Sequence, residues 1–143
     1  ICGSRDLIDY LINFGRPFIY TTALPIHSIF SIDAAFDFLI ENPGLQEQLK
    51  SKITKFNQLY HEQISELNGI SKPYSDTAIQ PIIIPGNNRI KEISNKLQQE
   101  GFDVRPILSP TVKAGTERLR ICLHTHNSDE EIDKLINTLA KHI

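Results

Sequence analysis

The chain has 143 residues, enough for one domain with a real core, and its 40% hydrophobic and 22% charged residues are ordinary for a globular protein. The formal net charge of -2 and the pI near 6.2 give no reason to expect nucleic acid or an anionic membrane surface as a partner. Apolar runs stay well short of the roughly 20 residues that a membrane-spanning helix needs, and no signal peptide is visible.

The cysteines and histidines predict neither a disulfide framework nor a metal site. Cys2 and Cys122 have no CxxC spacing, which predicts free thiols in a reducing compartment and so a cytoplasmic location. Two of the five histidines, His124 and His126, form a close pair, but no nearby residue completes a metal-ligand spacing. The chain has no methionine and begins at Ile1, just before a predicted helix, which suggests a piece of a longer protein.

The first predicted helix covers residues 4–13, with Ser4 as its cap and four apolar residues on one face: Leu7, Ile8, Leu11 and Ile12. Residues 15–24 are predicted to be extended, because Pro17 disfavours helix at Arg16. This segment contains two adjacent threonines, Thr21 and Thr22. Their hydroxyls either cap the helix that follows or hold a ligand that needs hydroxyl donors.

The second predicted helix begins at Pro25 and runs to Asn42. It is apolar nearly all round, which predicts burial on several sides. In so small a chain, the cover would have to come from a missing part or from a second subunit. Leu45 to Leu67 then form an amphipathic stripe, which predicts a long helix that packs on a core or, alternatively, forms a coiled coil.

Residues 78–143 predict strand, helix, strand, loop, strand and helix in that order. The ranges are strand 78–85, helix 87–100 with Gly101 after it, strand 102–108, loop 109–116, strand 117–124, and a last helix opened by the capping box Ser128–Glu131. This order predicts an α/β fold with helices packed on a small sheet.

Arg120 is the strongest candidate for a binding residue. It lies in a strand that alternates apolar residues with Arg118, Arg120 and Cys122, so both arginines could simply face solvent. The functional alternative is a guanidinium fork for a carboxylate, since its planar donors match two oxygens at once. The loop at 109–116 is either a plain connection or the wall of a site, and the His124–His126 pair fits a surface position better than a general base.

Five segments together resemble the C-terminal part of the α-oxoamine synthases, a family of fold-type I pyridoxal-phosphate (PLP) enzymes: GSRDLIDYLIN, RPFIYTTALP, AIQPIIIPGNN, GFDVR and PTVKAGTERLRICL. The resemblance implies a homodimeric enzyme that condenses an amino acid with an acyl thioester and releases carbon dioxide. It also implies that residues 1–44 belong to the large domain and dimer interface and that residues 45–143 form the small C-terminal domain, with a mainly antiparallel sheet.

The resemblance also implies roles for individual residues. Arg120 matches the arginine that binds the carboxylate of the amino acid, and Thr111 matches a loop residue near the acyl substrate. Thr22, with Thr21 beside it, matches a segment whose hydroxyl reaches the PLP phosphate of the neighbouring subunit. The lysine that holds the cofactor precedes the matching stretch, so the chain alone is expected to be inactive.

The branch of the family is less clear from the residues. The likeness is strongest to the branch that joins L-alanine to a pimeloyl thioester in biotin biosynthesis, and a glycine acetyltransferase is the alternative. Leu108 replaces a second arginine on the acyl side, and Arg105 either compensates for it or faces solvent. A small-molecule-binding regulatory module is the alternative from another class, but it would have no use for RPFIYTTALP and the apolar helix.

Overall fold

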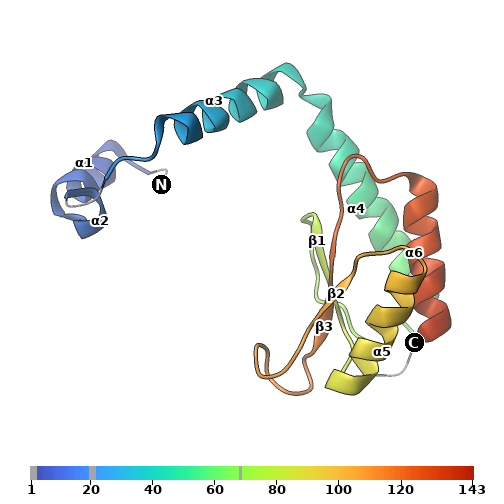
Figure 1. Cartoon of the computed structure of the whole chain (residues 1–143). Helices are drawn as coiled ribbons and strands as arrows, with labels where there is room; N and C mark the ends of the chain where they lie inside the picture. Colours follow the sequence, from blue (N-terminus) through green and yellow to red (C-terminus); the bar gives the residue numbers. More distant parts are fainter. Residues whose placement is uncertain (1–2, 20–21, 68) are drawn as a thin grey trace. The chain divides into compact units, whose positions relative to one another are not determined.

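The computed structural model describes residues 3–19, 22–67 and 69–143, and the chain divides into two compact units, Ile1–Asn42 and Pro43–Ile143 (Figure 1). The first unit begins with α1 (Arg5–Phe14), where the Ser4 hydroxyl accepts a hydrogen bond from the Leu7 amide at 3.3 Å. The predicted cap is therefore confirmed, because a hydroxyl one residue before a helix satisfies an amide without an intrahelical partner.

The expectation that residues 15–24 are extended is wrong at its start, where the short helix α2 (Arg16–Ile19) forms. Pro17 lies in the first turn of α2, and an amide in the first turn of a helix has no intrahelical acceptor. Proline therefore loses no helical hydrogen bond there, and Arg16 adopts a helical conformation despite the preference for extended backbone at a residue before proline.

Helix α3 (Ile26–Glu41) forms where the sequence predicts a helix, and this chain by itself does not bury its apolar side chains. None of its residues is buried, and Ile26, Phe30, Phe36 and Ile40 are 63–74% exposed. The first unit has only 42 residues, and its described residues form no sheet, so they supply no second layer against which an apolar helix could pack. Cover from a preceding part or a second subunit stays a prediction.

The second unit is built around α4 (Gly44–Gln63), whose predicted apolar stripe enters the core. Phe56 is 0% exposed, and Ile53 and Tyr60 are each 8% exposed. Helix α4 packs against α6 (Asp129–His142), so the stripe belongs to a packed helix and not to a coiled coil. It ends before the predicted Leu67, yet Ile64 in the following turn is still fully buried.

The sheet has three strands in the order β1–β3–β2, and both pairings are antiparallel. The strands are β1 (Ile79–Ile83), β2 (Arg105–Ile107) and β3 (Arg118–Cys122), with α5 (Asn87–Gln99) between β1 and β2. Figure 1 shows α4, α5 and α6 on one side of the strands. Inward residues such as Ile82, Leu119 and Ile121 are buried by this helical layer. None of the described helices of the second unit covers the opposite face of the sheet (Figure 1).

Strand β2 is shorter than the predicted strand 102–108, because the end of α5 takes up the preceding residues. The Phe102 amide donates to the carbonyl of Leu97, and Gly101 has a positive φ of 94°, as expected for the residue that closes a helix. The Val104 amide then turns back to the carbonyl of Phe102 at 2.8 Å. The chain therefore joins the sheet only from Arg105 onward.

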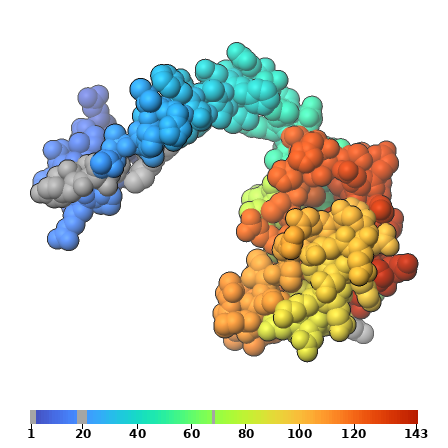
Figure 2. Space-filling model, viewed as in Figure 1, coloured from blue at the N-terminus to red at the C-terminus, as the bar shows by residue number. Residues whose placement is uncertain are grey.

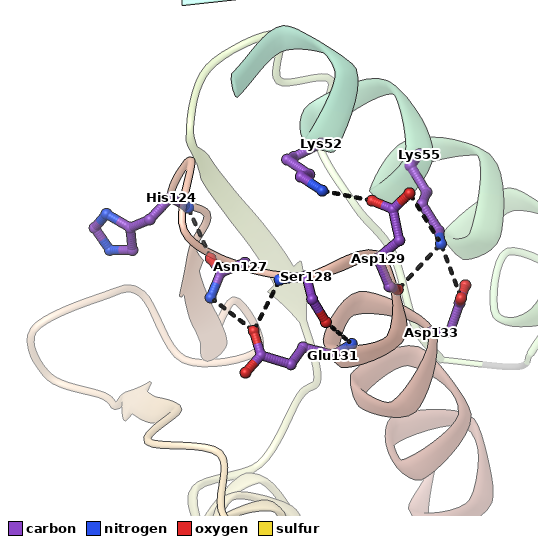
Figure 3. A network of polar contacts seen from close by, with 8 residues as sticks. All are labelled: Lys52, Lys55, His124, Asn127, Ser128, Asp129, Glu131 and Asp133. Carbon is purple, nitrogen blue, oxygen red and sulfur yellow. Dashed lines mark hydrogen bonds and ion pairs between the residues drawn. The ribbon is translucent and has the colours of Figure 1, made fainter. Parts of the chain in front are cut away.

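The start of α6 contains the predicted capping box, which Figure 3 shows. The Ser128 hydroxyl accepts from the Glu131 amide at 3.1 Å, and the Ser128 amide donates to the Glu131 carboxylate at 3.0 Å. Two helical amides are satisfied in this way, and the prediction is confirmed.

Two ion pairs in the same view tie α4 to α6 (Figure 3). Lys52 Nζ lies 2.6 Å from Asp129 Oδ1, and Lys55 Nζ lies 2.8 Å from Asp133 Oδ2. The hydrogen bond from Lys52 lowers the pKa of Asp129, and the hydrogen bond to Asp133 raises the pKa of Lys55. These pairs orient the end of α6 that borders the candidate site.

Among the described residues, no helix is both long and apolar enough to cross a bilayer.

Candidate functional site

Arg120 lies on the face of the sheet that the helices leave open. Its neighbours Leu119 and Ile121 are 0% and 4% exposed and point into the core, so Arg120 points the other way and is exposed. Across the sheet, Arg120 is paired in register with Arg105 of β2. Within the described part of the chain, the guanidinium of Arg120 has no hydrogen-bond or ion-pair partner, which leaves its donors free for a ligand.

A pocket of about 570 Å³ opens beside Arg120, at the beginning of β2, where β3 continues past it. Its polar lining comes from the turn after α5, both strands and the start of α6: Asp103, Arg105, Arg120, His124, Asn127 and Glu131. The rest of its lining is largely apolar, for example Phe102, Leu123 and Leu135. This size and this mixture of a few polar groups with apolar walls are typical of small-molecule sites.

Arg105 is exposed and also lines this pocket, so whether it compensates for the arginine that Leu108 replaces stays a prediction. Its Nε lies 2.6 Å from Asp103 Oδ1, and the two side chains are 74% and 76% exposed. The sequence alone did not show this arrangement, because the proximity of Arg105 and Arg120 depends on strand pairing across 14 residues of intervening chain.

Thr111 lies apart from the residues that line this pocket. It is exposed in the loop at 109–116, which Figure 2 shows in orange at the surface of the second unit. The loop folds on itself through hydrogen bonds from the Val112 amide to the Leu108 carbonyl and from the Thr116 amide to the Lys113 carbonyl. The structure therefore does not bring Thr111 and Arg120 into one pocket, and its role near the acyl substrate stays a prediction.

Glu117, which the sequence analysis did not single out, ties this loop to the start of α5. Its side chain is 3% exposed, and its Oε2 accepts hydrogen bonds from the amides of Gly86 and Gly115, both at 3.0 Å. The hydrogen bond from Gly86, its own backbone amide and the bond from Gly115 together hold the pKa of Glu117 below its usual value, against the opposing effect of desolvation.

We expect Glu117→Gln to lower the melting temperature of the second unit by several degrees at neutral pH, because the amides of Gly86 and Gly115 lose a charged acceptor. A carboxyl whose pKa is lowered by folding stabilises the protein above its unfolded pKa and loses this effect as the pH falls through its folded pKa. The difference from the unmodified chain should therefore shrink as the pH falls through the acidic range, which circular-dichroism melting at several pH values can follow.

Glu92→Gln is the matched control, since Glu92 is exposed on α5. It should leave the melting temperature almost unchanged across the same pH series. Equal melting temperatures for Glu117→Gln and Glu92→Gln at neutral pH would show that the carboxylate of Glu117 does not stabilise the loop.

The two histidines at the end of β3 stack on each other, with ring centroids 4.9 Å apart and planes 9° from parallel. The amide of His124 donates to Asn127 Oδ1 at 2.8 Å, and His124 lines the Arg120 pocket. Across residues 3–19, 22–67 and 69–143, no group of three potential ligands is placed to hold a metal ion. Both histidines are exposed, His124 at the pocket, and in the part of the chain that the structure describes neither ring has a carboxylate partner that would make it a general base.

Thr22 lies in the first unit, exposed and just before α3, while Thr21 falls outside the described residues. The N-cap of α3 is Pro25, and no side chain caps this helix among the described residues. The capping alternative is thus wrong for Thr22, which is three residues too early to reach the first turn as an N-cap. The first amides of α3 have no side-chain cap among the described residues, and such amides are donors for a phosphate.

The family described as aminotransferase class I and II matches residues 1–139 of this chain. The 8-amino-7-oxononanoate synthase of Emericella nidulans is 38% identical over 140 residues, which are 94% of this chain and 33% of that protein. The enzyme of the same name from Methylococcus capsulatus is 37% identical over 140 residues, 98% of this chain and 35% of that protein. The chain thus spans about a third of the length of these curated relatives.

Solved structures agree with this match. The crystal structure of 8-amino-7-oxononanoate synthase from Francisella tularensis superposes with a TM-score of 0.79 and 26% identity, covering 98% of this chain and 39% of that chain. A serine palmitoyltransferase of Sphingomonas wittichii, 18% identical with a TM-score of 0.78, shares the fold over 96% of this chain and 34% of its own. The predicted fold class, a small α/β domain of a PLP fold-type I enzyme, is confirmed.

Proposed function

The chain belongs to the aminotransferase class I and II family, whose enzymes depend on PLP, and from this premise we propose that it forms the C-terminal part of a synthase that makes 8-amino-7-oxononanoate. The complete protein would condense L-alanine with a pimeloyl thioester and release carbon dioxide, in biotin biosynthesis. The observation that carries this proposal is the free guanidinium of Arg120 beside an amphiphilic pocket, in a chain 38% identical to a relative of that name.

Arg120 is the residue that would bind the carboxylate of the amino acid. Its planar guanidinium can donate to both oxygens of one carboxylate, which fixes the orientation of the substrate as well as its position. Correct orientation matters here because the bond that breaks is the one between the carboxylate and the α-carbon.

Thr22 is the residue that would contribute to the cofactor site. When bound, PLP supplies the electron sink that stabilises negative charge at the α-carbon. The Thr22 hydroxyl and the first amides of α3 would donate to the phosphate of the cofactor, which the resemblance assigns to the neighbouring subunit. The lysine that holds the cofactor would lie before Ile1.

Helix α3 supports the proposal that the complete protein is a homodimer. Its three phenylalanines, Phe30, Phe36 and Phe38, are 56–63% exposed in this chain. Contiguous apolar surface of this kind marks an interface, since an isolated unit gains nothing from leaving it in water. We propose that a second subunit and the preceding part of the protein cover it.

The family match supports an enzyme more than a regulatory module, because it includes the first 44 residues.

The test of the proposed function is an assay of the complete protein with PLP and pimeloyl thioester, in which alanine, glycine and serine compete as amino acids. Alanine should give the highest kcat/KM. A clear preference for glycine with an acetyl thioester would instead identify a glycine acetyltransferase, and no decarboxylative condensation with any pair would contradict the proposal.

The chain of 143 residues is the control in this assay. It should show no synthase activity, and borohydride reduction with PLP should leave no stable adduct at one specific lysine, because none of its lysines lies in the motif that holds the cofactor. Mass spectrometry of the digested chain can detect such an adduct. A single stoichiometric adduct on one lysine would contradict the assignment of the cofactor lysine to the preceding part.

A further inference from the structure

Two arginines lie side by side on the open face of the sheet. Arg105 of β2 is the register partner of Arg120 of β3, so their side chains project from the same face. Like charges directly opposite each other in an antiparallel pair are destabilising. A sheet that keeps two guanidinium groups in this position therefore favours the presence of an anion between them.

Asp103 balances only one of the two charges. Its Oδ1 lies 2.6 Å from Nε of Arg105, whereas within the described residues Arg120 has no acidic partner. The Asp103–Arg105 pair is 74–76% exposed and spans only two residues, so it is weak and can open when a better anion arrives. All three side chains line the same pocket.

We propose that Arg105 is a second carboxylate-binding residue. Its guanidinium and that of Arg120 bind one carboxylate between them, and Asp103 is the counter-ion that holds Arg105 while the ligand is absent. The apolar part of the pocket takes the aliphatic portion of the same ligand. The inference rests on the proposed function only for the identity of the carboxylate, which is then that of the amino-acid substrate.

The first test needs no catalytic activity. The 143-residue chain is titrated with sodium propionate at constant ionic strength, and the Nε–Hε signals of Arg105 and Arg120 are followed by NMR. Propionamide, which has the same shape without the charge, is the matched probe and should shift neither signal. Arg105→Ala should weaken propionate binding about five- to tenfold, as expected when one charge-assisted hydrogen bond is lost at an exposed site.

Two further variants test the role of Asp103 and supply a control for the loss of a nearby positive charge. Asp103→Asn should tighten propionate binding about two- to fivefold, because Arg105 then has no ion pair with residue 103 that must break before it can bind propionate. Arg118→Ala is the control, since Arg118 lies on the same face of β3 but does not line the pocket. Equal propionate affinity for Arg105→Ala and Arg118→Ala would overturn the inference, and so would weaker binding by Asp103→Asn.

Kinetics of the complete protein separate this inference from the proposed function. Arg105→Ala should raise KM for the amino acid and leave KM for the acyl thioester unchanged. If Arg120→Ala abolishes activity while Arg105→Ala changes neither constant, the synthase assignment stands and the inference fails. If the protein has no synthase activity but propionate binding depends on both arginines, the carboxylate site stands and the proposed function fails.

Discussion

Arg120→Ala in the complete protein is expected to lower kcat/KM for the amino acid by about 10- to 150-fold, the equivalent of about 1.5–3 kcal/mol for hydrogen bonds to a charged group. Arg120 is the arginine of the open sheet face that has no partner among the described residues, so its donors are available to the substrate. Much of the loss should appear in KM, because the carboxylate is bound before the reaction as well as during it. Steady-state kinetics with varied amino acid measure the change.

Arg120→Lys separates the charge of this residue from its shape. Lysine keeps the positive charge but cannot donate to two carboxylate oxygens in one plane, so activity should fall between that of Arg120→Ala and that of the unmodified protein. Arg118→Ala is the control, because it removes a neighbouring charge of the same strand that lies outside the pocket. If kcat/KM is the same for Arg120→Ala as for the unmodified protein, Arg120 simply faces solvent.

Phe56→Ala is expected to lower the free energy of unfolding of the second unit by about 3–5 kcal/mol, the usual cost of removing a buried phenyl ring. Phe56 is 0% exposed and lies in the middle of the stripe by which α4 enters the core. A loss of this size is a large part of the stability of a small domain. Urea unfolding of the 143-residue chain, followed by circular dichroism, measures it.

Phe36→Ala is the matched control, with the same substitution at a side chain that is 63% exposed on α3. It should change the free energy of unfolding by less than about 0.5 kcal/mol. If Phe56→Ala does not fold, Phe56→Leu, at a cost of about 1 kcal/mol, keeps the comparison measurable. Equal effects at positions 36 and 56 would mean that α4 does not anchor the core of the second unit.

Elements defined by neighbouring residues were predictable from the sequence. Ser4 caps α1, Ser128 and Glu131 form the capping box of α6, and Gly101 closes α5 as expected. The apolar stripe of α4 and the alternation in β3 were predictable for the same reason. Each depends on residues within about four positions of one another, where the period of a helix or a strand is directly visible.

The departures came from contacts that no local pattern contains. Pro17 was expected to prevent a helix, yet α2 accommodates it in its first turn. The hydrophobic pattern of α3 predicts a partner surface, which the described residues of the first unit do not supply, so its burial stays a prediction. An apolar pattern shows that a helix needs a packing partner, but it does not show which surface provides that partner.

The features of the candidate site also fall into those that the sequence shows and those that depend on the tertiary structure. The sequence by itself determined that Arg120 stands in an alternating strand next to a long loop, and the family resemblance added the carboxylate that it would bind. Only the tertiary structure decided that β3 lies between β1 and β2, because strand order depends on long-range pairing. This order brings Arg105 opposite Arg120, and the fold closes Glu117 onto Gly86, 31 residues away; periodicity cannot span either separation in the sequence.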